Sequence, residues 1–161
     1  MALSALANFD TPSVLHTLAR AASDPDEQIG TAAIGFLAGR AEHEATATLV
    51  HLLGAPATSE RALAGLLVPA QGRVPGLLVA LESAGDELAP ILTSVLAKLP
   101  GSGAATALKQ ALQLANVAAR KAAASALAAR GSAEATAALR RAADTDPDPS
   151  VRQICALLLA Q

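Results

Sequence analysis

The side chains best suited to catalysis or metal binding in this sequence are three histidines and one cysteine. His16, His43 and His51 fall in the first helices of the helix pairs predicted below, and none has a second histidine or a cysteine at the spacing of zinc ligands. Cys155 follows Val151 by four residues on an expected buried stripe, without a basic or histidine neighbour that would lower its pKa. We therefore predict surface histidines, a core cysteine, and no catalytic or metal-binding residue.

The loop at residues 100–106 is a candidate phosphate-binding segment. It reads Pro-Gly-Ser-Gly-Ala-Ala-Thr and opens a predicted helix, and helix N-termini bind anions. A nucleotide-binding loop follows a strand and usually carries a Lys-Ser or Lys-Thr pair, whereas this loop follows a helix and occupies the place that residues 130–132 hold one repeat later. We therefore predict a turn between repeats, no cofactor and no enzymatic activity.

The composition of the chain favours helices as the elements that carry these side chains. Hydrophobic residues make up 52% of the 161 residues, but aromatic residues only 1%. Leucine and alanine must therefore fill the interior; both are strong helix formers, whereas strands would need the β-branched and aromatic residues that are scarce here. A chain of this length is expected to form one domain, residues 1–161.

The sequence also indicates in which cellular compartment the protein resides. Residues 1–10 contain no lysine or arginine, which a secretory signal would need. The longest stretch without a charged residue, 45–59, is shorter than the roughly 20 apolar residues that span a bilayer. A single cysteine cannot form an internal disulfide and fits a reducing compartment. We therefore expect a cytoplasmic protein that does not enter a membrane.

A repeat of about 30 residues runs along the chain. Six leucines that close apolar stretches are spaced 31, 29, 30, 31 and 32 residues apart: Leu6, Leu37, Leu66, Leu96, Leu127 and Leu159. Twelve residues after each of the first five comes another leucine, namely Leu18, Leu49, Leu78, Leu108 and Leu139. A constant period with a constant internal offset predicts structural units that stack on one another.

Each repeat is predicted to contain two helices. In residues 11–40, Pro12 suits a helix start, Pro25 and its flanking aspartates interrupt the apolar pattern, and Gly39 suits a helix end. The first helices of the later repeats are predicted at residues 42–53, 73–83, 102–115 and 132–143, and the second helices at residues 59–68, 86–99, 116–130 and 149–160.

Residues 146–160, Asp-Pro-Asp-Pro-Ser-Val-Arg-Gln-Ile-Cys-Ala-Leu-Leu-Leu-Ala, resemble the loop and second helix of a HEAT-like repeat. Residues 24–29 echo the Asp-Pro turn, and Ala119-Arg120 takes the Val-Arg place, whereas residues 55–60 and 83–87 lack the turn. The period is similar to the short bacterial form of the repeat, also found in phycobilin lyase subunits. The resemblance implies an all-α fold, a right-handed α-solenoid (α-α superhelix) of about five stacked antiparallel helix pairs.

The resemblance further implies that the second helices line a concave binding surface. Counted from the Val-Arg place, its outward residues are Gln28, Thr31, Glu60, Glu87, Arg120, Lys121, Arg152 and Gln153. We predict that a protein partner lies along this surface. Arg120 and Arg152 have a second interpretation, which we favour over partner contact: ion pairs with loop carboxylates such as Asp146 or Asp148.

The charge distribution leaves two other functions open. Residues 1–97 carry four basic and ten acidic residues, whereas residues 98–161 carry eight basic and four acidic ones. The basic part could follow nucleic-acid phosphates, but the isoelectric point near 5.9 and the scarcity of aromatic residues make nucleic acid the less favoured partner. The likeness to lyase subunits allows a third function, an accessory or regulatory subunit of an enzyme such as a bilin lyase-type complex.

The ends of the chain suggest further contacts. Residues 1–8 resemble a second helix without its first, and the sequence stops on Leu-Leu-Leu-Ala-Gln, so neither end shows the polar cap of a solenoid. We expect either a segment of a longer array or a homodimer formed through the C-terminal helix pair.

Overall fold

The computed structural model describes residues 12–160, and every regular element in that range is a helix. The helices are α2 (Pro12–Ala22), α3 (Glu27–Ala38), α4 (His43–Leu52), α5 (Pro56–Leu67), α6 (Arg73–Glu82), α7 (Leu88–Lys98), α8 (Ser102–Ala111), α9 (Val117–Arg130), α10 (Ala133–Thr145) and α11 (Pro149–Leu159). The all-helical prediction is confirmed. No helix of this range has both the length and the apolar composition needed to cross a membrane.

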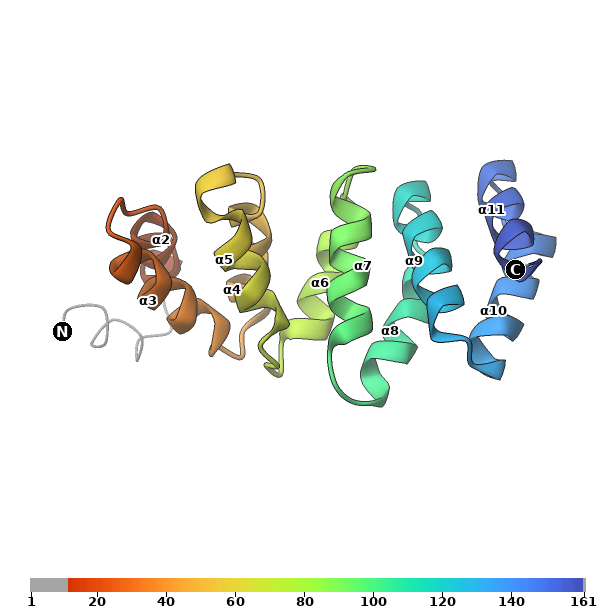
Figure 1. Ribbon diagram of the computed structural model, residues 1–161, viewed down its shortest axis with the longest axis horizontal. Helices are drawn as coiled ribbons and strands as arrows, with labels where there is room; N and C mark the ends of the chain where they lie inside the picture. Colours follow the sequence, from red (N-terminus) through yellow and green to blue (C-terminus); the bar gives the residue numbers. More distant parts are fainter. Residues whose placement is uncertain (1–11, 161) are drawn as a thin grey trace. The chain divides into compact units, whose positions relative to one another are not determined.

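The helices fall into two compact units, residues 1–77 and residues 78–161, and α6 begins in one and ends in the other. In the first unit α2 packs on α3 and α4, and α3 packs on α4 and α5. In the second unit α7, α9 and α11 pack side by side, while α8 contacts α7 and α9, and α10 contacts α9 and α11. Figure 1 shows α9 and α11 in front of α8 and α10. The even-numbered first helices and odd-numbered second helices thus form two layers in that unit.

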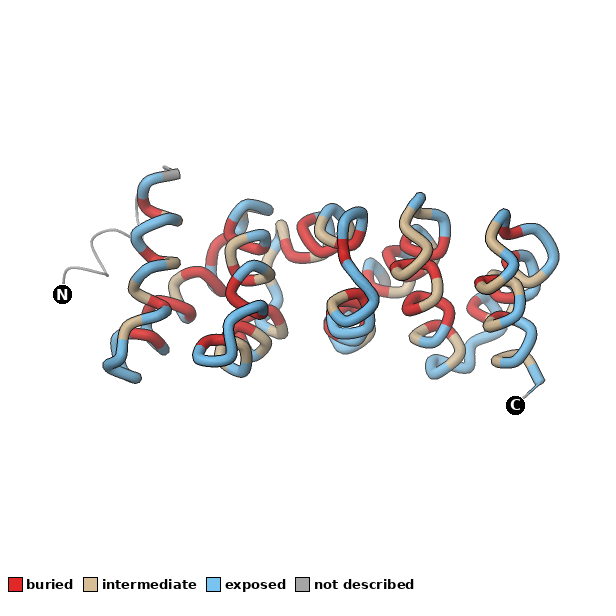
Figure 2. The backbone as a smooth tube through the Cα atoms, turned by 90° about the horizontal axis from the view of Figure 1, so that it is seen from above, coloured by how far each residue is buried: buried red, intermediate tan, exposed pale blue. Residues whose placement is uncertain are grey.

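The recurring leucines form the core of each unit. The second-helix leucines Leu37, Leu66, Leu96 and Leu127 are at most 1% exposed, and the first-helix leucines Leu18, Leu49, Leu108 and Leu139 at most 2%. In Figure 2 the buried residues lie on the sides of the helices that face their neighbours, and the exposed residues lie on the outer sides. The predicted register is confirmed at these eight positions.

Two leucines of the repeat do not follow the predicted pattern. Leu78 is only half-buried, because Leu77 and Leu81, one helical turn apart, take the fully buried positions of α6. The register of α6 is therefore shifted by one residue. Leu159, in the last turn of α11, is also half-buried. Leu6 and the helix predicted for residues 1–8 lie outside the described residues.

Short polar side chains begin several of the second helices. The Asp26 carboxylate accepts hydrogen bonds from the N–H groups of Gln28 at 2.8 Å and Ile29 at 3.4 Å, and so caps α3. Asn116 and Asp148 cap α9 and α11 in the same way. These bonds satisfy N–H groups that have no partner within the helix, which is why the chain turns into a helix directly after each cap.

The second repeat closes its loop without the Asp-Pro-Asp turn. The buried hydroxyl of Thr58 donates to the carbonyl oxygens of Leu52 at 2.7 Å and Ala55 at 3.2 Å. Helix α5 begins at Pro56, three residues before the predicted start, because proline is well tolerated in a first turn. A threonine thus replaces the aspartate as the residue that fixes this loop.

Candidate functional site

Five of the eight predicted partner-binding residues are exposed. Gln28 and Thr31 lie on α3 and Glu60 on α5 in the first unit, while Glu87 directly precedes α7 and Gln153 lies on α11 in the second unit. Within the described part of the chain, no hydrogen bond or ion pair engages these five side chains. We call the outward side of α3 and α5, and that of α7, α9 and α11, the second-helix surface of the respective unit.

Arg120 has a different environment from the other predicted residues, because its guanidinium is buried. Its Nε and Nη2 atoms donate to the two carboxylate oxygens of Asp146 at 2.9 and 3.0 Å, and the two side chains are only 7% and 5% exposed. Nη1 donates to the carbonyl oxygens of Leu114 at 2.9 Å and Ala115 at 2.8 Å. The predicted ion pair of Arg120 with a loop carboxylate is confirmed, and it ties α9 to the loop before α11.

Arg152 and Lys121 are both half-buried near the same loop. Arg152 does not pair with a carboxylate as predicted; its Nη1 donates to the carbonyl oxygens of Asp146 at 2.6 Å and Pro147 at 3.2 Å. A guanidinium can satisfy its donors on either kind of oxygen, and here the backbone is within reach. The charge of Lys121 contributes to a lowered pKa of Asp148, although hydrogen bonds from Ser150 are the main cause.

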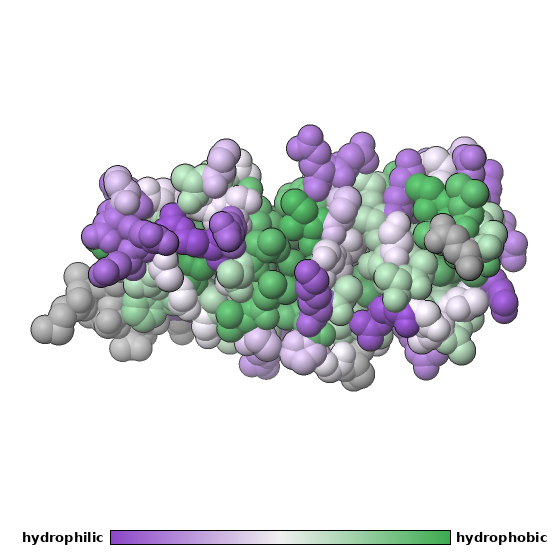
Figure 3. Space-filling view, viewed as in Figure 1, coloured by the Kyte–Doolittle hydropathy of each residue, from purple (hydrophilic) through white to green (hydrophobic). Residues whose placement is uncertain are grey.

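The second-helix surfaces combine polar side chains with exposed apolar ones. Ile29 on α3, Ile91 on α7 and Leu157 on α11 are 38%, 39% and 59% exposed. Figure 3 shows hydrophilic side chains gathered over α3 and α5, and hydrophilic and hydrophobic areas interspersed over the helices of the second unit. Such a mixture resembles the average composition of transient protein interfaces more than that of a permanent, apolar one.

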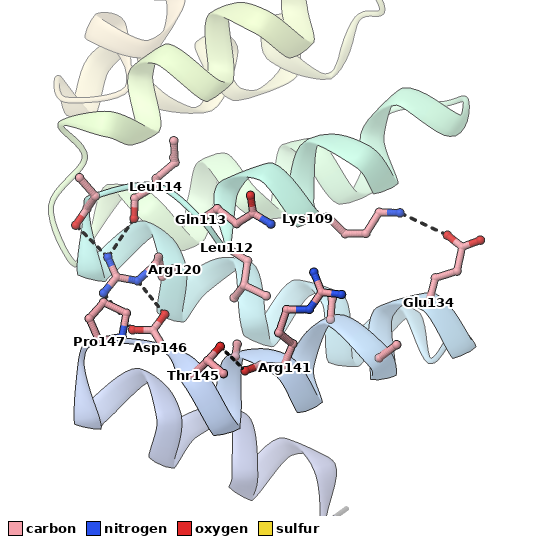
Figure 4. A pocket seen from close by; sticks show the side chains of 14 residues that line it. Lys109, Leu112, Gln113, Leu114, Arg120, Glu134, Arg141, Thr145, Asp146 and Pro147 are labelled. Carbon is pink, nitrogen blue, oxygen red and sulfur yellow. Dashed lines mark hydrogen bonds and ion pairs between the residues drawn. The ribbon is translucent and has the colours of Figure 1, made fainter.

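A groove between the first helices α8 and α10 is a site that the sequence did not predict. Its cavity measures about 770 Å³. Leu112 and Leu114, at and after the end of α8, and Ala137, Ala138 and Ala142 on α10 supply its apolar lining. Figure 4 shows the polar side chains Lys109, Arg141 and Glu134 at the same groove. The alanines are unremarkable in an alanine-rich sequence, so only the separation of the two helices reveals the cavity.

Within the described residues, some charged side chains of the groove have a partner of opposite charge, and one does not. Lys109 Nζ lies 3.4 Å from Glu134 Oε2, and this pair is exposed. Asp146 is engaged by Arg120 as described above. In the described part of the chain no carboxylate pairs with Arg141, which is exposed and extends from α10 at the groove (Figure 4). With three basic and two acidic side chains in its lining, the groove favours an anionic group beside Arg141.

The first unit contains a buried cation of its own. Arg73 is 1% exposed and donates to the carbonyl oxygen of Ala38 at 2.8 Å, the hydroxyl of Thr46 at 3.0 Å and the carbonyl oxygen of Val68 at 3.2 Å. Burial lowers the pKa of Arg73. Its three acceptors come from the end of α3, from α4 and from the loop before α6. We assign this arginine to structure, since its donors are directed at backbone and hydroxyl oxygens inside the unit.

The histidines and the cysteine lie where the sequence predicted. His16, His43 and His51 are exposed, and His43 Nε2 lies 3.3 Å from the exposed carboxylate of Glu44. Cys155 is fully buried, and its pKa is raised, mainly by burial and also by the charge of Asp146. Among residues 12–160, no three His, Cys, Asp or Glu side chains gather in a way that could hold a metal ion.

The basic residues of the second unit do not form one phosphate track. Arg120 is buried in its ion pair, and Arg152 and Arg130 donate to backbone carbonyl oxygens, the latter to Ala97 at 3.3 Å. Lys109 and Arg141 belong to the first-helix layer, whereas Lys98 and Lys121 lie on second helices. A nucleic-acid backbone would need such charges on one surface.

Comparison with known proteins gives a match over most of the chain. The family described as HEAT repeats matches residues 1–67 and 74–160. This match accounts for the described helices as the stacked pairs of an α-solenoid. No curated protein matches the chain.

One similar solved structure is human deoxyhypusine hydroxylase in complex with glycerol. It is 22% identical, with a TM-score of 0.49, and the match covers 99% of this chain. The chain spans 65% of the length of that structure. A likeness of this degree carries no conclusion about the activity of the present chain.

Proposed function

Since the chain belongs to the HEAT repeat family, we propose that it is a non-enzymatic scaffold, a cytoplasmic module that binds a protein partner on its second-helix surfaces. The observation that carries this proposal is the exposure of Gln28, Thr31, Glu60, Glu87 and Gln153, whose side chains make no hydrogen bond or ion pair within the described residues. These side chains are therefore available to a ligand.

The chemistry of the surface indicates the kind of partner. Ile91 lies one turn from Glu87 and Ser94 on α7, and Leu157 lies one turn from Gln153 on α11. Exposed apolar side chains can insert into small pockets of a partner, while charged residues of the surface select its orientation. Arg120 and Arg152 serve the proposed interface indirectly, because they fix the loops that position α9 and α11.

A capture experiment tests this proposal. The tagged chain is used as bait in a lysate of its source organism, next to a variant with Glu87→Lys and Lys121→Glu on the second-helix surface. The matched control carries Asp144→Lys and Arg140→Glu on α10, which make the same two charge reversals in the first-helix layer. We expect a partner that is retained by the wild type and the control and lost from the second-helix variant.

The opposite pattern would contradict the proposal. If the second-helix variant retains the same proteins in the same yield as the wild type, its surface is not the binding site. Circular dichroism of both variants verifies that they are folded.

A further inference from the structure

We propose that the groove between α8 and α10 binds a short amphipathic helix whose apolar side is flanked by an acidic residue. The groove lies in the first-helix layer, so this site is separate from the second-helix surface of the same unit. The inference therefore does not rest on the scaffold function proposed above.

The length of the groove fits a helix. Its lining on α10 recurs at three- and four-residue steps over three turns, at Glu134, Ala137, Ala138, Arg141, Ala142 and Thr145. These positions extend about 17 Å along the helix axis, at about 1.5 Å per residue. A peptide helix of about three turns has the same length and can lie along α10 over this distance.

The packing of the neighbouring layer supports the same occupant. In the first unit, the adjacent first helices α2 and α4 pack against each other. In the second unit, the adjacent first helices α8 and α10 are instead separated by the cavity. The small side chains of Ala137, Ala138 and Ala142 leave room for a third helix to approach closely, and Leu112 offers it an apolar contact.

The charged side chains of the groove determine the sign of the charge that its partner should carry. Arg141 is the cation of the groove without a carboxylate, since Asp146 is bound by Arg120 and Glu134 lies beside Lys109. An acidic side chain next to the apolar side of the bound helix would pair with Arg141, and a guanidinium can bind a carboxylate through two hydrogen bonds. A basic helix would bring like charges together at Arg141 and Lys109.

The test uses a fluorescein-labelled peptide of about 15 residues, long enough to form a helix, with leucines at three- and four-residue spacing and glutamates beside them. Fluorescence anisotropy is measured as the full chain is titrated. One comparison peptide carries lysine in place of glutamate, and a second has the same composition with the leucines scrambled. We expect saturable binding of the acidic amphipathic peptide alone.

Two variants of the protein locate the site. Arg141→Glu is expected to weaken binding by about tenfold or more, because the partner of the carboxylate becomes a like charge. Arg140→Glu makes the same charge change at the adjacent exposed residue of α10, outside the groove lining, and should leave the affinity within about twofold. Ala138→Leu, which fills the groove without changing its charge, should also abolish binding.

Arg141 makes no side-chain bond within the described residues, so its variant should fold, and circular dichroism verifies this. Equal affinities of Arg141→Glu and Arg140→Glu, or equal binding of the scrambled peptide, would overturn the proposal. Absence of peptide binding would also overturn the proposal. Binding of dodecanoate in place of the peptide would overturn it as well, because the groove would then be a site for a small carboxylate. Glu87→Lys should leave peptide binding unchanged, which keeps this result independent of the second-helix surface.

Discussion

At the residue scale, two of the buried arginines, Arg73 and Arg120, show how this chain holds its repeats in register with very few polar groups. Arg73 joins the end of α3, helix α4 and the loop before α6 through three hydrogen bonds. Arg120 joins the turn after α8 to the loop before α11 through four. In each case one long guanidinium side chain links segments that the short side chain of alanine could not reach. Their burial means that removing either should cost far more than removing a surface charge.

Arg120→Ala is expected to lower the free energy of unfolding by about 3–5 kcal/mol, because Asp146 would remain buried without a partner. Lys121→Ala, at the next position and only half-buried, should change it by less than about 1 kcal/mol. Urea unfolding followed by circular dichroism measures both. Similar losses for the two variants would show that the ion pair contributes no more than an exposed charge.

Alanine substitutions at two glycines are expected to change the stability of the protein in opposite directions. A Cβ atom on Gly72 would lie 2.0 Å from the backbone oxygen of Ala41, so the two chain segments would have to separate. Gly72→Ala should therefore destabilise the protein by about 1–3 kcal/mol, as overpacking does. Gly35, inside α3, has nothing within 4 Å of the same position, and Gly35→Ala should stabilise by about 0.5–1 kcal/mol through helix propensity. Thermal unfolding of both variants tests the pair, and a stabilising Gly72→Ala would show that this contact is loose.

At the scale of the helices, stability depends on a few leucines set among alanines. Helix α9 buries Ala119, Ala122, Ala123 and Ala124, but its one large apolar core residue is Leu127. Alanine buries little apolar surface, and hydrophobic stabilisation is roughly proportional to the area removed from water. The packing of α9 on α7 and α11 should therefore depend strongly on this residue.

Leu127→Ala is expected to cost about 2–5 kcal/mol, the usual range for a leucine buried in a core. Leu157→Ala, on the exposed side of α11, should cost less than about 0.5 kcal/mol. Chemical denaturation gives both values. A loss below about 1 kcal/mol at Leu127 would contradict its core position.

The N-terminus of α11 should make the stability depend on pH. The Ser150 hydroxyl, then backbone N–H groups, hold the pKa of Asp148 below its ordinary value near 4. The folded-state pKa is thus lower than the unfolded one, so the cap contributes fully above about pH 4 and is lost as the pH falls through the lowered value.

Asp148→Asn keeps an acceptor oxygen but does not titrate, so its unfolding free energy should fall less than that of the wild type between neutral and acidic pH. Asp144→Asn, on α10, replaces an exposed carboxylate that caps no helix and should retain the wild-type slope. Urea titrations at several pH values compare the three proteins. Parallel curves for the wild type and Asp148→Asn would show that this carboxylate is not responsible.

At the scale of the whole molecule, the repeats of each unit contact their neighbours within that unit, so stability should be local. Within the second unit, α9 contacts α7, α8, α10 and α11, and Arg120 links it to the loop before α11. Arg120→Ala should therefore raise amide hydrogen exchange mainly in α8 to α11 and leave α2 to α5 close to the wild type. Mass spectrometry of peptic fragments measures this. An equal rise in α2 and α3 would indicate that the chain opens as one cooperative body.

The sequence by itself determined the helical class, the period and most of the core. Alanine and leucine at three- and four-residue spacing specify helices locally, and prolines and capping residues mark the helix ends. The helices and their ends can therefore be predicted without knowledge of distant contacts. The ion pair of Arg120, the exposed histidines and the buried Cys155 follow from the same register.

Tertiary structure decided the rest. Whether Arg73 is buried depends on carbonyl and hydroxyl groups that lie 35 and 27 residues earlier in the chain, at Ala38 and Thr46. Whether alanines on α10 close against α8 or leave a groove depends on how far apart the two helices are held. A local sequence pattern shows which side of a helix is apolar. The distance between neighbouring helices is instead set by packing over the whole unit, and the distance between α8 and α10 creates the groove beside Arg141.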